Sequence, residues 1–339
     1  MPSITGKEVG PVGFGMMGLT LKPPGKTPSN DQSFAAMKAA LANGANNWNG
    51  GEIYGPPEAN SLQLLNAYFT KYPEDADKVV ISIKGGCNVG GIMAGAKPNG
   101  TPENIKRSID ECLRVLDGKK FLDLFEAARV DPNVPVETTI AAIDEYVKAG
   151  KIGGIALSEV SAATIRKAAK VAKISAVEVE FSLWATDILE NGVAAACAEN
   201  DIPIIAYSPI GRGFLTGELQ KPEDLAPDDL RRHFPRFQGE AFYENLKLVK
   251  EVEKIASAKR CTAGQVALAW IQAHSGAKGL PVIIPIPGAS TDKRVNENSK
   301  SASIKLSDSE MTEIEDLLKN FKPTGGRYPG DPKAAYLEG

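Results

Sequence analysis

The chain of 339 residues has little of what a metal site or a disulfide framework needs. It has two histidines, His233 and His274, and four cysteines with no C-x-x-C pair. Zinc sites need closely spaced cysteine and histidine ligands, so we expect no metal. Isolated cysteines are typical of proteins from reducing compartments, which makes the cytoplasm the expected location.

Net charge and long apolar runs are equally scarce. A formal net charge of −3 gives no basic surface for nucleic acid or anionic lipid. No apolar run approaches the roughly 20 residues of a membrane span, and the opening MPSITGKEVG lacks the pattern of a secretory signal. We therefore expect a small-molecule partner rather than nucleic acid or a membrane, and the oligomeric state stays open.

Regular alternation of apolar strands and amphipathic helices predicts an α/β fold. The predicted strands are 12–14, 46–48, 79–83, 122–125, 152–157, 176–181, 202–207 and 281–286. The predicted helices are 33–43, 60–68, 101–116, 136–149, 161–171, 187–199, 241–257, 262–272 and 291–298. Eight strand–helix units indicate one (β/α)8 TIM barrel over residues 1–339. A further helix at 307–321 and a tail at 325–339, either frayed or folded over the mouth, would follow the barrel.

The glycines of Gly13-Phe14-Gly15-Met16-Met17-Gly18 fit the G-x-G-x-x-G spelling of a dinucleotide-binding turn. That turn must open a helix, whose N-terminus holds the pyrophosphate. The chain continues through Lys22-Pro23-Pro24, which cannot form the first turns of a helix. We therefore expect a glycine-rich strand end near the barrel mouth instead.

Tyr54 and Lys84 are the first candidate catalytic residues. Lys84 ends the apolar run 79–83, and a polar residue at the C-terminal end of a barrel strand points into the mouth. A nearby ammonium would lower the phenol pKa from about 10, making Tyr54 a proton donor to a carbonyl. The alternative is a core tyrosine and a surface lysine.

Loops after three predicted strands can share one pocket at the mouth. In 207–217, the Tyr207 ring can stack on a planar group, and backbone amides with Arg212 suit a pyrophosphate. In 284–298, two hydroxyls at a helix start and Arg294 one turn later suit a phosphate. Together they describe a nicotinamide dinucleotide, with the extra phosphate favouring NADPH. The glycine-rich loop 85–100 is either a spacer or a flap over substrate.

With these motifs in order, the chain resembles the aldo-keto reductases over essentially its whole length, and within them the fungal pyridoxal reductases. The matching segments are Glu52-Ile53-Tyr54-Gly55, Lys84, Arg129-Val130-Asp131-Pro132, 207–217 and 286–298. The resemblance implies a barrel that binds NADPH and reduces an aldehyde to an alcohol, most simply pyridoxal to pyridoxine, reversibly. Two alternatives stay open: an NADPH-binding sensor subunit with little turnover, and a reductase of broad aldehyde specificity.

The resemblance also implies roles for individual residues. Tyr54 would be the general acid and Lys84 its modulator, with Asn49 at a third catalytic position. Trp48, Arg129 and Trp184 would line the substrate pocket, although ordinary packing accounts equally well for either tryptophan. Cofactor contacts would come from Ser158, Glu178, Tyr207, Ser208, Pro209, Gly211, Arg212, Gly213, Ser290, Thr291, Arg294, Glu297 and Asn298.

The chain departs from the family pattern at several of these positions. The family has an aspartate where this chain has Asn49, so Lys84 should lack a charged partner. The family's second carbonyl donor, a histidine, falls at Ala128. Arg129 follows, but strand alternation would point it away from the mouth. The amide-binding asparagine and glutamine appear as Glu159 and Glu178, and the phosphate-binding lysine and serine appear as Gly288 and Ala289.

Overall fold

The computed structural model describes residues 1–23, 25–88 and 97–330. Eight parallel strands pair in chain order. They are β3 (Phe14–Gly15), β4 (Asn47–Gly51), β5 (Val80–Gly85), β6 (Leu124–Ala127), β7 (Ile155–Ser158), β8 (Ile174–Glu180), β9 (Ile204–Tyr207) and β10 (Ile283–Pro285). The first and last strands are joined because the amide of Gly13 donates to the carbonyl of Pro285 at 2.9 Å, and Gly15 bridges Gly288. The predicted TIM-barrel fold is confirmed.

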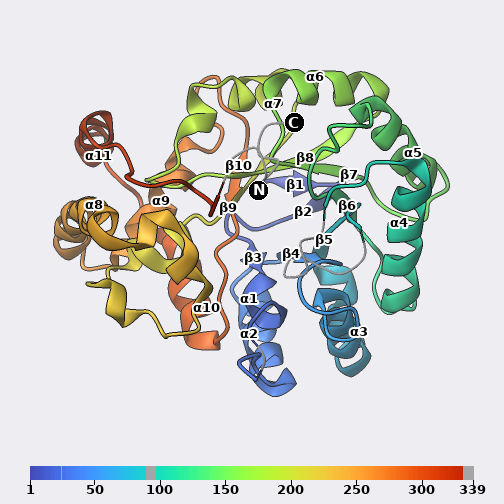
Figure 1. Ribbon diagram of the computed structural model, residues 1–339, viewed down its shortest axis with the longest axis horizontal. Helices are drawn as coiled ribbons and strands as arrows, with labels where there is room; N and C mark the ends of the chain where they lie inside the picture. The colour runs from blue at the N-terminus through green and yellow to red at the C-terminus, as the bar shows by residue number, and fades with distance from the viewer. Residues whose placement is uncertain (24, 89–96, 331–339) are drawn as a thin grey trace.

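Helices surround the strands in a ring (Figure 1). They are α2 (Asn30–Ala42), α3 (Ser61–Lys71), α4 (Pro102–Leu116), α5 (Val136–Lys148), α6 (Ala162–Val171), α7 (Val193–Glu199), α8 (Gly239–Lys259), α9 (Ala263–His274) and α10 (Asp292–Ser299). The predicted extra helix is α11 (Asp308–Asn320), which lies outside the ring against α8. Lys259 and Glu310 form an ion pair between these two helices at 2.8 Å.

Two local expectations differ from the structure. A one-turn helix, α1 (Met17–Thr20), does begin within the glycine motif, because Pro23 and Pro24 come late enough to permit four helical residues. The barrel topology still excludes the open dinucleotide-binding sheet. The helix expected at 187–199 is interrupted at Gly192, whose φ of +87° is left-handed, so α7 starts only at Val193.

An N-terminal hairpin that the sequence analysis did not predict closes one end of the barrel. Strands β1 (Ser3–Ile4) and β2 (Lys7–Glu8) pair around Thr5 and Gly6, both with positive φ. Ile4 and Val9 join an apolar cluster inside the barrel. Its other members are Val80, Leu124, Ala156, Ala176, Ile205 and Ile284 on the barrel strands, and Ile286 just after β10. This barrel floor, as we name the cluster, leaves polar side chains to fill the barrel nearer the mouth.

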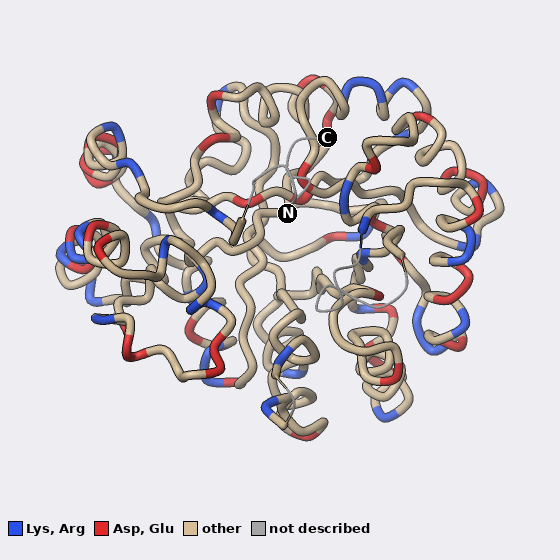
Figure 2. The backbone as a smooth tube through the Cα atoms, viewed as in Figure 1, with Lys and Arg blue, Asp and Glu red and all other residues tan. Residues whose placement is uncertain are grey.

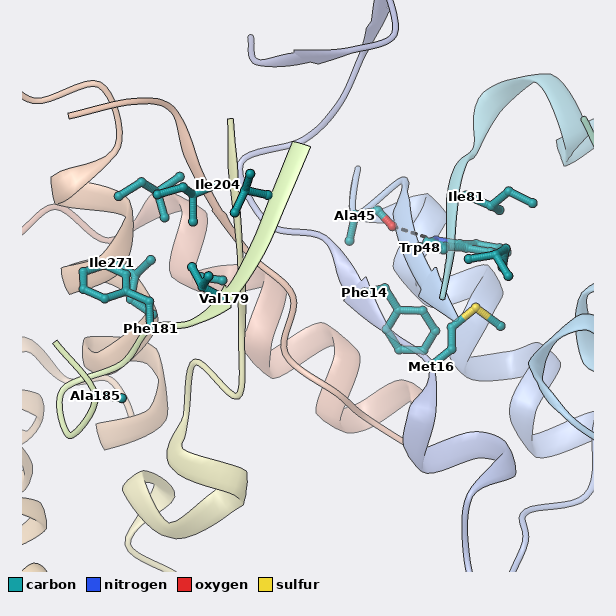
Figure 3. Packing of buried hydrophobic residues seen from close by; sticks show 14 of the residues in the cluster. Phe14, Met16, Ala45, Trp48, Ile81, Val179, Phe181, Ala185, Ile204 and Ile271 are labelled. Carbon is teal, nitrogen blue, oxygen red and sulfur yellow. Dashed lines mark hydrogen bonds between the residues drawn. The ribbon is translucent and has the colours of Figure 1, made fainter. Parts of the chain in front are cut away.

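A larger apolar cluster fills the space between strands and helices, and Trp48 is one of its centres (Figure 3). Its indole N–H donates to the carbonyl of Ala45 at 2.8 Å, and its ring stacks on Phe69.

Figure 2 shows charges of both signs interspersed along the outer helices, with a smaller group near the strands. None of the helices in the described ranges is both long and apolar enough to cross a bilayer.

Helix α9 carries a complete capping box, which provides a simple test of local stability. The hydroxyl of Thr262 accepts from the amide of Gln265 at 3.3 Å, and the Gln265 side chain accepts from the amide of Thr262 at 3.1 Å. Thr262→Ala removes the hydroxyl, so we expect the free energy of unfolding to fall by about 1 kcal/mol. Urea unfolding curves measure this change, and Thr262→Ser is the control that keeps the oxygen. Equal losses in both variants would contradict the capping role.

Candidate active site

Four side chains from three neighbouring strands and from β8 meet inside the barrel above its floor. Asn49 on β4, Lys84 on β5, Glu126 on β6 and Glu178 on β8 are all buried. Strand alternation points them inward, whereas Trp48 points outward to the helices. Lys84 lies in register directly beside Glu126, so the parallel pairing itself brings these two charges together.

Lys84 has two charged partners, so the expectation that it would lack one is wrong. Its ammonium lies 2.9 Å from a carboxylate oxygen of Glu126 and 2.5 Å from one of Glu178. It also donates to the amide oxygen of Asn49 at 3.3 Å. Burial alone would lower the pKa of Lys84, but the charges of Glu126 and Glu178 outweigh it and raise that pKa. The ammonium therefore stays charged although it is buried.

Tyr54 lies in the turn after β4, and Lys84 Nζ is 5.9 Å from the centre of its ring. Burial raises the pKa of Tyr54 to about 12; the charge of Lys84 opposes this shift, and those of Glu178 and Glu126 reinforce it. The expected lowering by Lys84 is thus reversed, because desolvation and two carboxylates outweigh one ammonium. Tyr54 is therefore a neutral phenol that keeps its proton.

Glu178 holds its proton more tightly than an ordinary carboxyl. Burial, and next the charge of Glu126, raise the pKa of Glu178 to about 8, while Lys84 opposes the shift. The side-chain amide of Asn49 donates to Glu178 at 2.5 Å and to Glu126 at 3.4 Å. The carboxyl of Glu178, expected to contact a nicotinamide amide, therefore faces Lys84 and Asn49.

Arg129 reaches the mouth despite the argument from alternation. Strand β6 ends at Ala127, so Arg129 lies beyond the region where strand alternation fixes side-chain direction. Its guanidinium donates to the hydroxyl of Ser158 at 3.3 Å, and its charge acts on Tyr54. Ala128, where the family has histidine, shares a small apolar cluster with Tyr54. A cation thus lies near the space where the family places an imidazole.

The described part of the C-terminal tail folds over the mouth. Of the two states expected for it, frayed or folded over the mouth, the structure shows the second. Arg327 donates to Glu180 at 2.9 Å, to Glu159 at 3.0 Å and to the hydroxyl of Tyr207 at 3.2 Å. The hydroxyl of Tyr328 lies 2.9 Å from that of Tyr207. Two tail side chains therefore contact residues expected to hold a nicotinamide.

Removing the Arg327 side chain should release the tail. Charge-assisted hydrogen bonds contribute about 1.5–3 kcal/mol, so Arg327→Ala should raise the open population at least about tenfold. We expect hydrogen exchange of the Thr324 amide, which donates to Asn245 at 2.9 Å in the folded tail, to accelerate by a similar factor, because exchange follows the open population when opening is fast. Arg327→Lys, which keeps the charge, should fall between the wild type and Arg327→Ala. An unchanged exchange rate in Arg327→Ala would show that other contacts hold the tail.

The loop after β9 has an unusual backbone. Ser208, Gly211, Arg212 and Gly213 all have positive φ, which turns peptide groups out of the usual pattern. The Arg212 guanidinium lies over two neighbouring rings, 4.5 Å from the centre of Phe234 and 4.8 Å from that of Tyr328. Pro209, also expected to contact the cofactor, is buried beside Ser208.

Trp184 lies near this loop, whereas Trp48 does not reach the mouth. The ring of Trp184 stacks on Phe214 with centres 4.8 Å apart, and Arg236 lies over its face. A side chain at Gly211 would collide with the same indole. The structure places Trp48 between β4 and the helices, with its side chain fully buried, so the pocket role expected for it is not supported.

The second predicted phosphate region lies at the start of α10. Thr291 is the N-cap, and its hydroxyl accepts from the amide of Arg294. The Arg294 guanidinium bonds to Glu297 at 3.1 Å and pairs with Glu218, which lies between β9 and α8. Ser290 is half-buried beside the cap, and Asn298 is buried on the last turn. The Arg294 ion pairs must open before this guanidinium can hold a phosphate.

Sequence reasoning missed Glu126, Arg327 and Tyr328. A signal existed for Glu126, since an acidic residue within the apolar strand Leu122-Asp123-Leu124-Phe125-Glu126 must find a buried cation. The tail residues gave no such signal, because Gly- and Pro-rich segments carry no periodicity. Half of the loop 85–100, expected as either a spacer or a flap, lies outside the described residues, namely 89–96.

Comparisons with known proteins agree on one family. The model of the aldo/keto reductase family matches residues 11–319. The chain is 41% identical over 336 residues to "Probable pyridoxal reductase 2" of Schizosaccharomyces pombe, covering 97% of both chains. It is 38% identical to the aldo-keto reductase yakc [NADP(+)] of the same organism, covering 94% of this chain and 91% of the other. The solved glycerol dehydrogenase of Gluconobacter oxydans superposes with a TM-score of 0.80 at 23% identity, covering 97% of each chain.

Proposed function

Because this chain belongs to the aldo/keto reductase family, and is therefore an oxidoreductase, we propose that it reduces an aromatic aldehyde to an alcohol with NADPH. Pyridoxal is the first candidate, since a relative 41% identical over nearly the whole chain is named for that substrate. The observation that carries the proposal is Tyr54, a neutral phenol at the barrel mouth with the ammonium of Lys84 5.9 Å from its ring centre.

The residues around the mouth fit a nicotinamide dinucleotide. The loop with left-handed φ at Ser208, Gly211, Arg212 and Gly213 and the N-capped first turn of α10 would supply N–H donors for its phosphates. Tyr207 and Ser158 would lie at the nicotinamide, and Ser290, Thr291, Arg294, Glu297 and Asn298 at the adenosine end. When bound, the cofactor supplies a hydride to the carbonyl carbon. A preference for NADPH over NADH requires Arg294 to release Glu218 and to bind the extra phosphate of NADPH instead.

Tyr54 would donate its proton to the carbonyl oxygen of the aldehyde. Lys84 stays cationic beside it and stabilises the phenolate that remains. Arg129 brings a second cation to the oxygen's side of the pocket, near the position where Ala128 offers no donor. Such preorganised donors typically contribute a factor of about 10²–10³ each.

The substrate class is tested by following NADPH consumption with matched aldehydes. We expect turnover with pyridoxal, and faster reduction of salicylaldehyde than of benzaldehyde, because a ring hydroxyl beside the aldehyde can polarise the carbonyl where Ala128 cannot. Equal rates for the two benzaldehydes would remove the ring hydroxyl from the mechanism. Faster turnover of simple aliphatic aldehydes than of pyridoxal would favour the broad-specificity reductase.

A second candidate is an NADPH-binding sensor with little turnover. Ala128 favours it, since the family's second carbonyl donor is missing, and so does the tail contact of Arg327 with Tyr207. Tight NADPH binding, measured by fluorescence titration, without consumption on any tested aldehyde would establish the sensor and exclude the reductase.

A further inference from the structure

The unusual feature of the barrel interior is one ammonium facing two carboxyl groups. Lys84 Nζ contacts both Glu126 and Glu178, and the side-chain amide of Asn49 donates to both carboxyls. The hydroxyl of Ser82 donates to the oxygen of Glu126 that faces Asn49, at 3.0 Å. Both glutamates are at most 2% exposed, so water contributes little to their solvation.

Charge balance requires one proton in this group. Two ionised carboxylates and one ammonium would leave an uncompensated negative charge in a buried space, which is costly. Two carboxyls that share a site therefore keep a proton between them. The groups around Glu178 are Lys84 from β5, Glu126 from β6, Asn49 from β4, and Ser158 and Ile205 in register on β7 and β9. The neutral phenol of Tyr54 is acted on by Lys84, by both carboxyls and by Arg129.

The position of this proton matters for Tyr54. Both carboxyls raise the pKa of the Tyr54 phenol, whereas Lys84 lowers it. If the shared proton leaves, another negative charge appears beneath Tyr54, and the phenol becomes a weaker acid. A purely structural ion pair with Lys84 would need only one carboxylate. Lys84 has two, although its third neighbour, Asn49, is neutral.

We propose that Glu126 and Glu178 are positioning residues of the reductase: together they supply the anionic partner of Lys84, share one proton, and through Lys84 control proton donation by Tyr54. This role rests on the proposed reductase function. Reduction should then slow when alkaline pH removes the shared proton. Either carboxylate alone can balance Lys84, whereas loss of both leaves a buried ammonium without a counter-ion.

Single and double substitutions test this sharing. At saturating NADPH and aldehyde, kcat of the wild type should fall about threefold or more as pH rises through 8, the value to which the pKa of Glu178 is raised by burial and Glu126. Glu178→Gln and Glu126→Gln should each lower kcat at neutral pH by about threefold and abolish the alkaline decrease. The double variant should lose about 10²-fold or more, well beyond the product of the single losses.

A restored charge at position 49 distinguishes this role from simple destabilisation. Adding Asn49→Asp to the double variant places a carboxylate beside Lys84 again, so kcat should recover at least about tenfold. Glu180→Gln is the matched control: it removes a buried carboxyl from the same face of β8, but one that faces Arg327, and Asn49→Asp should not rescue it. The proposal would be overturned if the double variant lost only the product of the two single losses and Asn49→Asp restored no activity.

Infrared difference spectra provide a readout that needs no turnover. A protonated carboxyl has its own C=O band, and this band should disappear as pH rises through 8 in the wild type and in Glu180→Gln. It should be absent at neutral pH in both Glu178→Gln and Glu126→Gln, because each leaves a single ionised carboxylate. A band unaffected by either substitution would overturn the shared proton. If the wild type reduces no aldehyde, the reductase fails, but the infrared result still decides the carboxyl pair.

Discussion

Tyr54→Phe should lower kcat for aldehyde reduction by about 10²–10⁴-fold, the usual contribution of a positioned general acid. Phenylalanine keeps the ring that packs with Leu21, Ile53 and Cys87 but has no proton to give. Because the hydroxyl is lost without loss of packing, we expect the folded state and the dissociation constant for NADPH to change little. Single-turnover consumption of NADPH measures the chemical step directly.

The pH profile separates the phenol from the carboxyl pair. With the pKa of Tyr54 raised by burial to about 12, its deprotonation should not limit the wild type below roughly pH 11. Any decrease near pH 8 must come from another group. If Tyr54→Phe retains full activity, the aldo/keto reductase fold stands, but the proton comes from elsewhere, and Arg129 becomes the nearest cation to examine.

Trp48→Ala should be the most destabilising substitution among the residues discussed. The side chain is fully buried, its ring lies 5.3 Å from Tyr68 and 6.0 Å from Phe69, and its N–H donates to Ala45. Removing a buried Trp side chain typically costs about 3–5 kcal/mol, from lost burial and from the cavity that remains. Denaturant unfolding measures this loss, and Trp48→Phe should lose less because it keeps most of the ring volume.

The same variant tests where Trp48 lies relative to the substrate. Since its ring packs against the helices, KM for the aldehyde should stay within about twofold of the wild type once rates are corrected for the folded fraction. A large increase in KM with normal stability would instead place Trp48 in the pocket. Trp184→Phe is the comparison, because that indole lies beside the mouth loop at Gly211.

The barrel was predictable because its signals are local. Apolar strands and capped helices alternate eight times, and motif residues such as Tyr54 and Lys84 stand at strand ends where the fold itself brings them together. Strand register explains why the prediction that Lys84 lacks a charged partner was wrong. Its partners Glu126 and Glu178 lie on other strands, so their approach depends on pairing geometry that no single segment shows.

The direction of the Tyr54 shift could not be predicted for a related reason. A lysine beside a tyrosine suggests a lowered pKa, but the sign depends on burial and on the total charge nearby. Similarly, Arg129 defied alternation because the strand ends at Ala127, a boundary that periodicity defines only to within a few residues. The tail residue Arg327 carries no pattern, and only its contacts with Glu159 and Glu180 reveal its place.

The barrel floor has a consequence for the protein during synthesis. Ile4 and Val9 share their cluster with Ile284 and Ile286, and β3 is joined to the β10 side through Gly13 and Pro285. While the chain emerges from the ribosome, β3 therefore has an open edge until β10 is available. Until then Ile4 and Val9 of the hairpin also lack part of the apolar cluster in which they are buried. Open strand edges promote aggregation, so the nascent chain should depend on chaperones until β10 closes the ring.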